Sequence, residues 1–493
     1  MSEVGISPRA VALEGGVSRE YLLHHRVCPT VITANGALVV AVAPDALVPE
    51  ALDDLGLAYR RPIMPEVTPR EEVERLIARL TSGAEASLTV GHADQDDESL
   101  VADVRDVANS APVAAYVNFL VGEAVRAGAS DIHLEATRHG LTVRFRVDGI
   151  LLPAPAAPAG VEMAILSRLK LMADLDIAER RRPQDGRIRV RLADRELDVR
   201  VSTVPTLHGE SVVLRVLDRG GRPVGLDTLG MPAAMLEQVR SLARRPHGMV
   251  LVTGPTGSGK TTTLYAALRL RDAAAEKIIT IEDPIEYQLP GITQVPVHAQ
   301  AGVTFAQALR SILRQDPDVI MVGEMRDGET ASLAVQAAMT GHLVFSTLHT
   351  NDALGAIPRL VDLGVPPYLV AATVDAVMAQ RLVRRVCPDC AARVDPAAYE
   401  RHAAIPAAIR TAALMHGTGC SACRHTGYSG RLGVFELVVL SDAMQHAISR
   451  NASRADLRDL AERNEWHPLW DDAWSKAGVG LTTVEEVLRV VSA

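Results

Sequence analysis

Residues Gly254-Pro255-Thr256-Gly257-Ser258-Gly259-Lys260-Thr261 decide how this chain of 493 residues folds. The apolar, β-prone run 249–253 precedes them, and residues 262–268 follow with helical spacing. A strand, a G-x-x-x-x-G-K-T turn and a helix in this order are typical of a phosphate-binding loop, or P-loop. Its backbone N–H groups curl round an anion, and the helix N-terminus adds partial positive charge. We therefore predict a nucleotide site at Gly254, Pro255, Thr256, Gly257, Ser258, Gly259, Lys260, Thr261 and Thr262.

Two side chains of this loop carry the chemistry. Only four of the 51 basic residues are lysines, and Lys260 is one of them. A compact ammonium suits the β- and γ-phosphates better than the planar fork of arginine. The hydroxyl of Thr261 is placed to reach Mg²⁺, so ATP and Mg²⁺ are the expected ligands.

The composition predicts a globular chain of two to four domains. Hydrophobic residues make up 48% of it and charged residues 23%, and no apolar run approaches the roughly 18–20 residues of a spanning helix. The start at Met1 lacks the pattern of a signal peptide, so we expect a cytoplasmic protein. A net charge of −9 and 3% aromatic residues argue against a broad nucleic-acid surface.

Changes of pattern along the chain predict its division. Residues 91–99 are polar and acidic, as a solvated linker or an exposed loop would be, and 218–223 break a strand pattern with Gly and Pro. We predict a small α/β module at 1–90, a linker at 91–99, a second α/β domain at 100–218, a hinge linker at 219–226 and a nucleotide-binding domain at 227–493.

Within the last domain, strand and helix patterns alternate, which predicts a parallel sheet covered on both faces. Apolar runs at 277–281, 318–323 and 342–347 read as strands. Glu282, Glu324 and His349 follow them. These residues should lie at the carboxyl edge of the sheet, where the P-loop also lies.

Four of the five cysteines form two C-x-x-C pairs, Cys387/Cys390 and Cys420/Cys423, separated by residues 391–419. Each pair can present two thiolates to one side, and two pairs complete the tetrahedral sulfur shell of structural Zn²⁺. We therefore predict a zinc-binding insert at 387–423. Reduced thiols without metal, or a redox pair, are the alternatives.

Several blocks together resemble the type II/type IV secretion ATPase superfamily. Besides the P-loop they are 129–135, 180–188, 281–287, 313–327 and 340–351, in family order. The resemblance implies an α/β protein with a RecA-like motor domain, a preceding PAS-like domain and a homohexameric assembly. It also implies an ATPase at the inner membrane that powers protein export across the outer membrane by driving pseudopilus assembly, with an N-terminal module that docks on an inner-membrane partner and an inner-membrane platform protein as a further partner.

The resemblance also implies roles for single residues. Glu282 corresponds to the catalytic base, and Glu324 replaces the usual Walker B aspartate and would reach Mg²⁺ through a water. His342 and His349 belong to a histidine box that senses the nucleotide, although His342 fits an interior histidine equally well. Arginines that match family positions near the γ-phosphate or the subunit boundary are Arg200, Arg215, Arg310, Arg314 and Arg326.

Three other functions remain open at this stage. A type IV pilus assembly ATPase belongs to the same superfamily. A nucleic-acid translocase could use the same core, although the acidic charge and few aromatic residues count against it. A nucleotide-gated scaffold with negligible turnover is the third alternative.

Overall fold

The computed structural model describes residues 9–10, 19–33, 36–44, 46, 48–59, 61–81, 110–192, 195–218, 224–298, 301–395, 399, 405–406, 409, 412–464 and 466–491. They fall into two compact units. The first comprises residues up to Glu123 together with Met163–Met172 and Ile188–Glu196, and the second contains the rest. The predicted linker at 91–99 and residues 219–223 of the predicted hinge lie outside the described residues.

The N-terminal region is a small α/β fold with a four-stranded sheet of order β1-β2-β3-β4. Strand β3 is buried throughout, and helices α2 and α3 contribute Leu55 and Ile77 to the same apolar core. The elements are β1 (Arg9–Ala10), α1 (Arg19–His25), β2 (Val27–Ile32), β3 (Leu38–Val42), α2 (Val48–Tyr59), β4 (Ile63–Val67) and α3 (Arg70–Thr81).

A six-stranded sheet of order β7-β6-β5-β10-β9-β8 follows, antiparallel from β7 to β9. An Asp-Gly turn joins β6 to β7, with Asp148 and Gly149 both at positive φ. The elements are α5 (Ala111–Arg126), β5 (Ala129–Thr137), β6 (Gly140–Val147), β7 (Ile150–Pro153), α6 (Glu162–Met172), β8 (Gln184–Leu192), β9 (Arg195–Thr206) and β10 (Gly209–Asp218).

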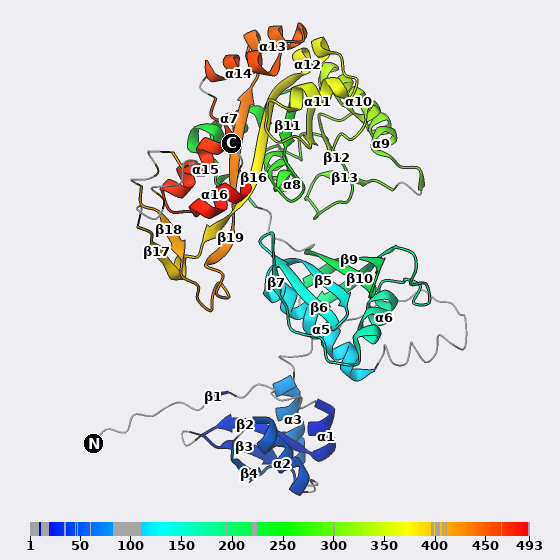
Figure 1. Ribbon diagram of the computed structural model, residues 1–493. Helices are drawn as coiled ribbons and strands as arrows, with labels where there is room; N and C mark the ends of the chain where they lie inside the picture. The colour runs from blue at the N-terminus through cyan, green and yellow to red at the C-terminus, as the bar shows by residue number, and fades with distance from the viewer. Residues whose placement is uncertain are drawn as a thin grey trace. The chain divides into compact units, whose positions relative to one another are not determined.

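The C-terminal region is built on a seven-stranded sheet of order β13-β12-β14-β15-β11-β16-β19 (Figure 1). All its neighbours are parallel except β16 and β19, which pair antiparallel at one edge. The parallel arrangement predicted from the alternating pattern is therefore confirmed for six strands. Its strands are β11 (Gly248–Thr253), β12 (Ile278–Glu282), β13 (Thr293–Pro296), β14 (Val319–Val322), β15 (Leu343–Leu348), β16 (Val374–Val386) and β19 (Tyr428–Val439).

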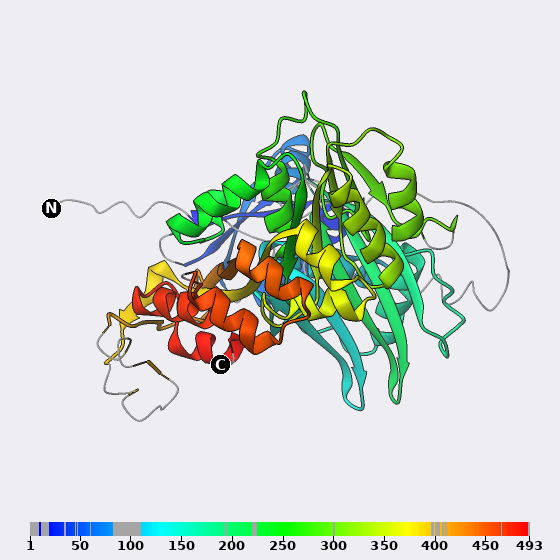
Figure 2. The same ribbon diagram turned by 90° about the horizontal axis from the view of Figure 1, so that it is seen from above.

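Helices cover both faces of this sheet. Successive residues of β11 point to opposite faces and so enter two different cores. Met249 and Leu251 join the core formed with α9 to α16, whereas Val250 and Val252 join the core formed with α7 and α8. In Figure 2 the orange and red helices α13 to α16 gather in one group. The helices are α7 (Ala233–Ala243), α8 (Lys260–Leu268), α9 (Phe305–Ile312), α10 (Gly328–Met339), α11 (Ala356–Asp362), α12 (Pro367–Thr373), α13 (Asp442–Ser449), α14 (Arg454–Glu462), α15 (Leu469–Gly478) and α16 (Val484–Val490), besides the 3₁₀ turn Leu226–Thr228.

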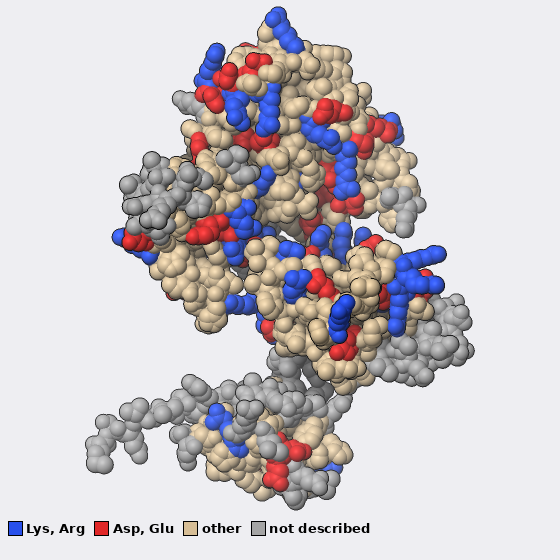
Figure 3. All heavy atoms as spheres, in the orientation of Figure 1, with Lys and Arg blue, Asp and Glu red and all other residues tan. Residues whose placement is uncertain are grey.

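The surface of the C-terminal region mixes both signs of charge. On the face seen in Figure 3, arginines and carboxylates stand close together among the described residues. Several form exposed ion pairs, such as Arg310 with Glu329 and Arg454 with Asp352. Among the described residues, no helix is both long enough and apolar enough to cross a bilayer.

Candidate functional site

The P-loop joins β11 to α8 and is held by backbone conformations that suit glycine. Gly254 has a φ of +147°, and a Cβ there would lie 2.4 Å from the carbonyl oxygen of Gln380. Gly259, at a φ of +87°, ends the loop where α8 begins at Lys260, two residues earlier than the predicted helix. A side chain at either glycine would therefore push the loop away from the neighbouring strand β16.

A cavity of about 790 Å³ opens over this loop. The predicted residues Thr256 to Thr262 line it, together with Glu282, Glu324, Arg326 and His349. The carboxyl ends of β11, β12, β14 and β15 meet here, as expected for ligand sites of open parallel sheets. Gly254 and Pro255 do not line the cavity, but their carbonyl oxygens accept hydrogen bonds from the Lys260 ammonium at 2.8 and 3.0 Å.

Lys260 is largely buried, which disfavours its charged form. Burial lowers the pKa of its ammonium to about 8, while the negative charge of Glu324 opposes the shift and Arg381 adds to it. A bound polyphosphate would supply further negative charge and favour the protonated form. Lys260 therefore lies where an anionic ligand would stabilise its positive charge.

Glu324 and His349 lie together at the carboxyl edge. Glu324 accepts a hydrogen bond of 2.6 Å from Arg326 and lies 3.3 Å from Nε2 of His349. Burial alone would raise the pKa of Glu324, but Arg326 and His349 outweigh it and lower this pKa. The carboxylate is therefore ionised at neutral pH, as a group that reaches Mg²⁺ must be. The hydroxyl of Thr261 and this carboxylate form an oxygen donor set that fits Mg²⁺.

Glu282 is buried, with 2% of its surface exposed. Its carboxylate accepts hydrogen bonds from the hydroxyls of Tyr265 and Thr280 and, at 3.1 Å, from the amide of Gln294. These three hydrogen bonds hold the carboxylate in place. Its oxygens are thus engaged with protein groups.

Several residues that the motifs did not single out also belong to this cavity. Glu286 lines it, and burial raises the pKa of its carboxyl group. Gln380 lines it too and accepts a hydrogen bond of 2.7 Å from Thr263 on α8. A signal for Gln380 was present in the sequence, because it is the polar residue that directly follows the apolar run 376–379.

The predicted histidines and arginines are distributed over different places. Arg215 on β10 lines the cavity, and its Nε donates a hydrogen bond of 2.9 Å to Asp131. Arg200 lies opposite Arg215 on β9 and is not among the lining residues. His342 precedes β15 and therefore lies at the amino edge of the sheet, where its Nδ1 contacts the carbonyl oxygen of Ala337 at 2.9 Å. On α9, Arg310 pairs with Glu329, and the following Arg314 donates to the carbonyl oxygen of Arg310.

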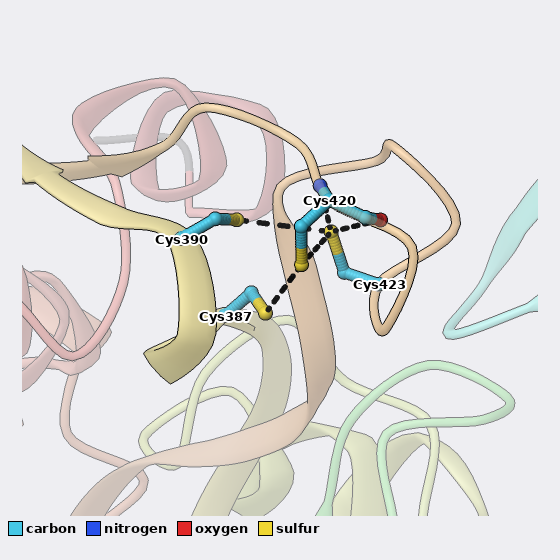
Figure 4. A group of neighbouring side chains, drawn as sticks. All are labelled: Cys387, Cys390, Cys420 and Cys423. Carbon is cyan, nitrogen blue, oxygen red and sulfur yellow. Dashed lines mark hydrogen bonds between the residues drawn. The ribbon is translucent and has the colours of Figure 1, made fainter. Parts of the chain in front are cut away.

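The four predicted cysteines converge in a second place. Figure 4 shows their sulfur atoms directed at one another, two from the end of β16 and two from the loop before β19. All four Sγ atoms lie within 4.8 Å of one another. Although burial opposes it, backbone N–H groups of Cys420 and Gly427, at 3.2 and 3.3 Å from Sγ, lower the pKa of Cys423 to about 6. A four-sulfur donor set of this kind suits a structural zinc ion.

The fold and the cavity together define a P-loop nucleotide-binding protein. The chain belongs to the family of type II/IV secretion system proteins, whose model matches residues 106–489. A second model, the MshEN domain, matches residues 2–87. The resemblance inferred from the sequence blocks is therefore confirmed.

Curated relatives and solved structures agree with this family. The chain is 45% identical over 489 residues to type II secretion system protein E of Xanthomonas campestris pv. campestris, covering 96% of this chain and 84% of the relative. It is 47% identical over 388 residues to type II secretion system ATPase E of Vibrio cholerae, covering 79% of this chain and 77% of the relative. A crystal structure of the pilus retraction motor PilT with bound ADP matches with a TM-score of 0.51 and 27% identity over 75% of this chain and 95% of that one.

Proposed function

We propose that this chain is the ATPase of a type II secretion system and that it drives pseudopilus assembly by hydrolysing ATP. The observation that carries the proposal is that Lys260, Thr261 and Glu324 line the same cavity. Relatives named type II secretion system protein E or ATPase E, at 45% and 47% identity, support secretion rather than pilus assembly.

In this proposal Lys260 binds the β- and γ-phosphates, and the loop amides from Thr256 to Thr261 surround them. Thr261 directly, and Glu324 through water, would hold Mg²⁺, which neutralises charge on the transferred phosphoryl group. Arg326 keeps Glu324 ionised and oriented. His349, next to Glu324, would report whether the γ-phosphate is present.

Either Glu282 or Glu286 would accept the proton of the attacking water. Glu282, the base expected from the sequence, already accepts hydrogen bonds from Tyr265, Thr280 and Gln294. These donors engage both oxygens of the Glu282 carboxylate. Glu286 lines the same cavity, and its raised pKa makes it a better proton acceptor near neutral pH. We therefore assign proton transfer to Glu286 and orientation of the site to Glu282.

The zinc, the partners and the location belong to the same proposal. Cys387, Cys390, Cys420 and Cys423 would hold one structural Zn²⁺, because their sulfurs already converge. The chain would assemble as a homohexamer at the inner membrane. Residues 2–87, matched by the MshEN domain, would dock on the cytoplasmic part of an inner-membrane secretion protein, and a platform protein would receive the work.

The test is steady-state phosphate release from ATP and Mg²⁺. Lys260→Ala removes the ammonium at the phosphates and should abolish turnover and weaken nucleotide binding. Lys277→Ala is the matched control, because Lys277 is exposed on the same domain and does not line the cavity. Near-normal release from the Lys260 variant would refute an ATPase that works through this loop.

A further inference from the structure

One carboxylate, that of Glu436, lies in the apolar core on the face of the sheet that α9 to α16 cover. Glu436 is on β19 between Val434 and Val438, which share its face of the sheet and belong to the core under α9 to α16. Only 1% of its surface is exposed. A buried carboxylate needs hydrogen-bond donors, because its transfer from water is otherwise very costly.

The donors of Glu436 come from two separate segments of the chain. The backbone N–H of Ala353 donates to Oε1 at 3.2 Å, and the backbone N–H of Leu469 donates to Oε2 at 3.4 Å. Ala353 belongs to the segment 349–355 that follows β15. Leu469 is the first residue of α15. Glu436 therefore joins this segment to the start of a C-terminal helix.

The other end of segment 349–355 touches the nucleotide site. Thr350 donates its backbone N–H to the hydroxyl of Thr253 at 2.8 Å, and the two hydroxyl oxygens are 2.7 Å apart. Thr253 is the residue directly before the P-loop. His349, at the start of the segment, lies against Glu324. The segment thus contacts the base of the loop and the acid expected near Mg²⁺.

A cation lies beside the same segment. Arg381 on β16 donates from Nη2 to the carbonyl oxygen of Asn351 at 2.9 Å. Burial lowers the pKa of Arg381, and the charges of Glu436 and Asp352 oppose that shift. Asp352 in turn pairs with Arg454 on α14. Segment 349–355 is therefore bound directly to β16, β19 and α14, and Glu436 links it to α15.

We propose that Glu436 is a positioning residue for ATP hydrolysis, which fastens segment 349–355 to α15 so that the state of the P-loop is transmitted to the C-terminal helices. The inference rests on the proposed function for its kinetic part only. A change at the phosphates would move Thr350 and His349, and through Ala353 and Glu436 it would move Leu469. In the reverse direction, Glu436 holds segment 349–355 so that His349 and Thr350 stay in position at the nucleotide site.

The first test uses a reporter that the chain itself supplies. All three tryptophans lie in or just before α15: Trp466 precedes it, Trp470 is in its first turn and Trp474 is in its middle. Adding ADP and Mg²⁺ to the full chain should change tryptophan fluorescence, and Glu436→Gln should abolish that change while nucleotide affinity measured by calorimetry stays within about threefold. Thr350→Val, at the other end of the segment, should have the same effect without altering the buried carboxylate. This second variant decides the outcome if the first does not fold.

The second test is kinetic. Glu436→Gln should lower kcat by roughly tenfold to a hundredfold, the usual cost of a misplacement near 1 Å, with KM nearly unchanged. Glu486→Gln is the matched control, because Glu486 is equally buried at 1% exposure but bonds to Arg384 and Arg489 away from the segment. It should lower the melting temperature and leave kcat and the fluorescence change intact.

The outcomes separate the two proposals. If nucleotide binds the wild-type chain without a fluorescence change, or if the Glu436 and Thr350 variants keep both the change and kcat, the relay does not exist. If the wild type shows the change but no Lys260-dependent hydrolysis, the proposed function fails and the relay stands.

Discussion

At the scale of single residues, the sharpest prediction concerns two carboxylates: Glu282, which ends β12, and Glu286, which follows it. Glu286→Gln should reduce kcat by about 10²–10⁴-fold, the range contributed by a general base, with little change in KM. Glu282→Gln should reduce kcat less and lower the melting temperature, because it disturbs a buried network with Tyr265 and Gln294. Steady-state phosphate release and thermal melts of both variants measure this. A larger loss in kcat for Glu282→Gln would return the role of base to Glu282.

Glu436 also predicts how stability depends on pH. Burial raises the pKa of its carboxyl group to about 7, so the folded chain keeps a proton that the unfolded chain has released above its ordinary pKa near 4.5. The stability that this bound proton provides is complete below pH 4.5 and is lost as the pH rises through 7. A shift of this size corresponds to roughly 3–4 kcal/mol.

Glu436→Gln has no such proton. Relative to the wild type, its unfolding free energy should therefore rise by roughly 2–3 kcal/mol, most of the full effect, between pH 5 and pH 7.5. Urea unfolding followed by tryptophan fluorescence measures the difference, and Glu486→Gln provides the comparison. The pKa of Glu486 is lowered to about 2, since Arg489 and Arg384 outweigh the effect of burial. If the difference in unfolding free energy between Glu436→Gln and the wild type stays constant across this pH range, Glu436 is ionised in the folded chain throughout it.

The sequence predicted the site residues whose positions follow from local patterns along the chain. It missed those whose positions depend on how helices and strands pack against one another. The P-loop residues and Glu324 could be located because a strand end and a glycine spacing define them. The donors to Glu282 could not, because Tyr265 meets it only after α8 packs on the sheet. His342 begins one of the predicted strands and His349 follows it, so the sequence placed only His349 at the carboxyl edge, where it lines the cavity.

At the scale of elements, the cysteine pairs predict a metal site that shapes the end of β16 and the loop before β19. The purified chain should contain about one zinc ion, and Cys387→Ser should lose it, because a three-sulfur shell binds Zn²⁺ much more weakly. Structural zinc contributes roughly 10–16 kcal/mol of apparent binding free energy in small peptides. We therefore expect residues 387–423 to become sensitive to proteases in this variant.

Metal analysis and limited proteolysis measure these effects. Cys28→Ser is the control, because Cys28 is a buried cysteine in the N-terminal region and has no part in the cluster. It should keep the zinc. A freshly reduced, unchelated preparation of the wild type without zinc would contradict the site.

Strands were the most predictable elements of the C-terminal region. Runs such as 319–322 are apolar on both faces, as expected for a strand buried between two helical layers. The edge strand β19 was harder to recognise, since its first residues are partly exposed and Glu436 interrupts its apolar face. Its antiparallel pairing with β16 brings Glu436 opposite Ala379, and long-range pairing of this kind leaves no local signal.

At the scale of the whole molecule, the question is how hydrolysis produces work. Arg200 and Arg215 lie opposite each other on β9 and β10, and Arg215 lines the nucleotide cavity. The remaining site residues come from the sheet of the C-terminal region. If ATP contacts both the arginines of β9 and β10 and the site residues of the C-terminal sheet, it stabilises one arrangement of these two regions. Hydrolysis then allows this arrangement to change. In a ring, each such change is passed to the neighbouring subunit.

This mechanism predicts that removing the two arginines impairs turnover far more than nucleotide binding. Arginines that contact transferred phosphoryl groups are worth on the order of 10³–10⁵ in rate in other NTPases, and with two sharing the task we expect the lower end or less for each. ATP affinity and steady-state hydrolysis should be measured for Arg200→Ala and Arg215→Ala, alone and together. Arg458→Ala, on the exposed face of α14, is the control for the loss of a positive charge. Unchanged hydrolysis in the double variant would mean that the arginines of β9 and β10 do not complete the site, and the coupling between the two regions would need another origin.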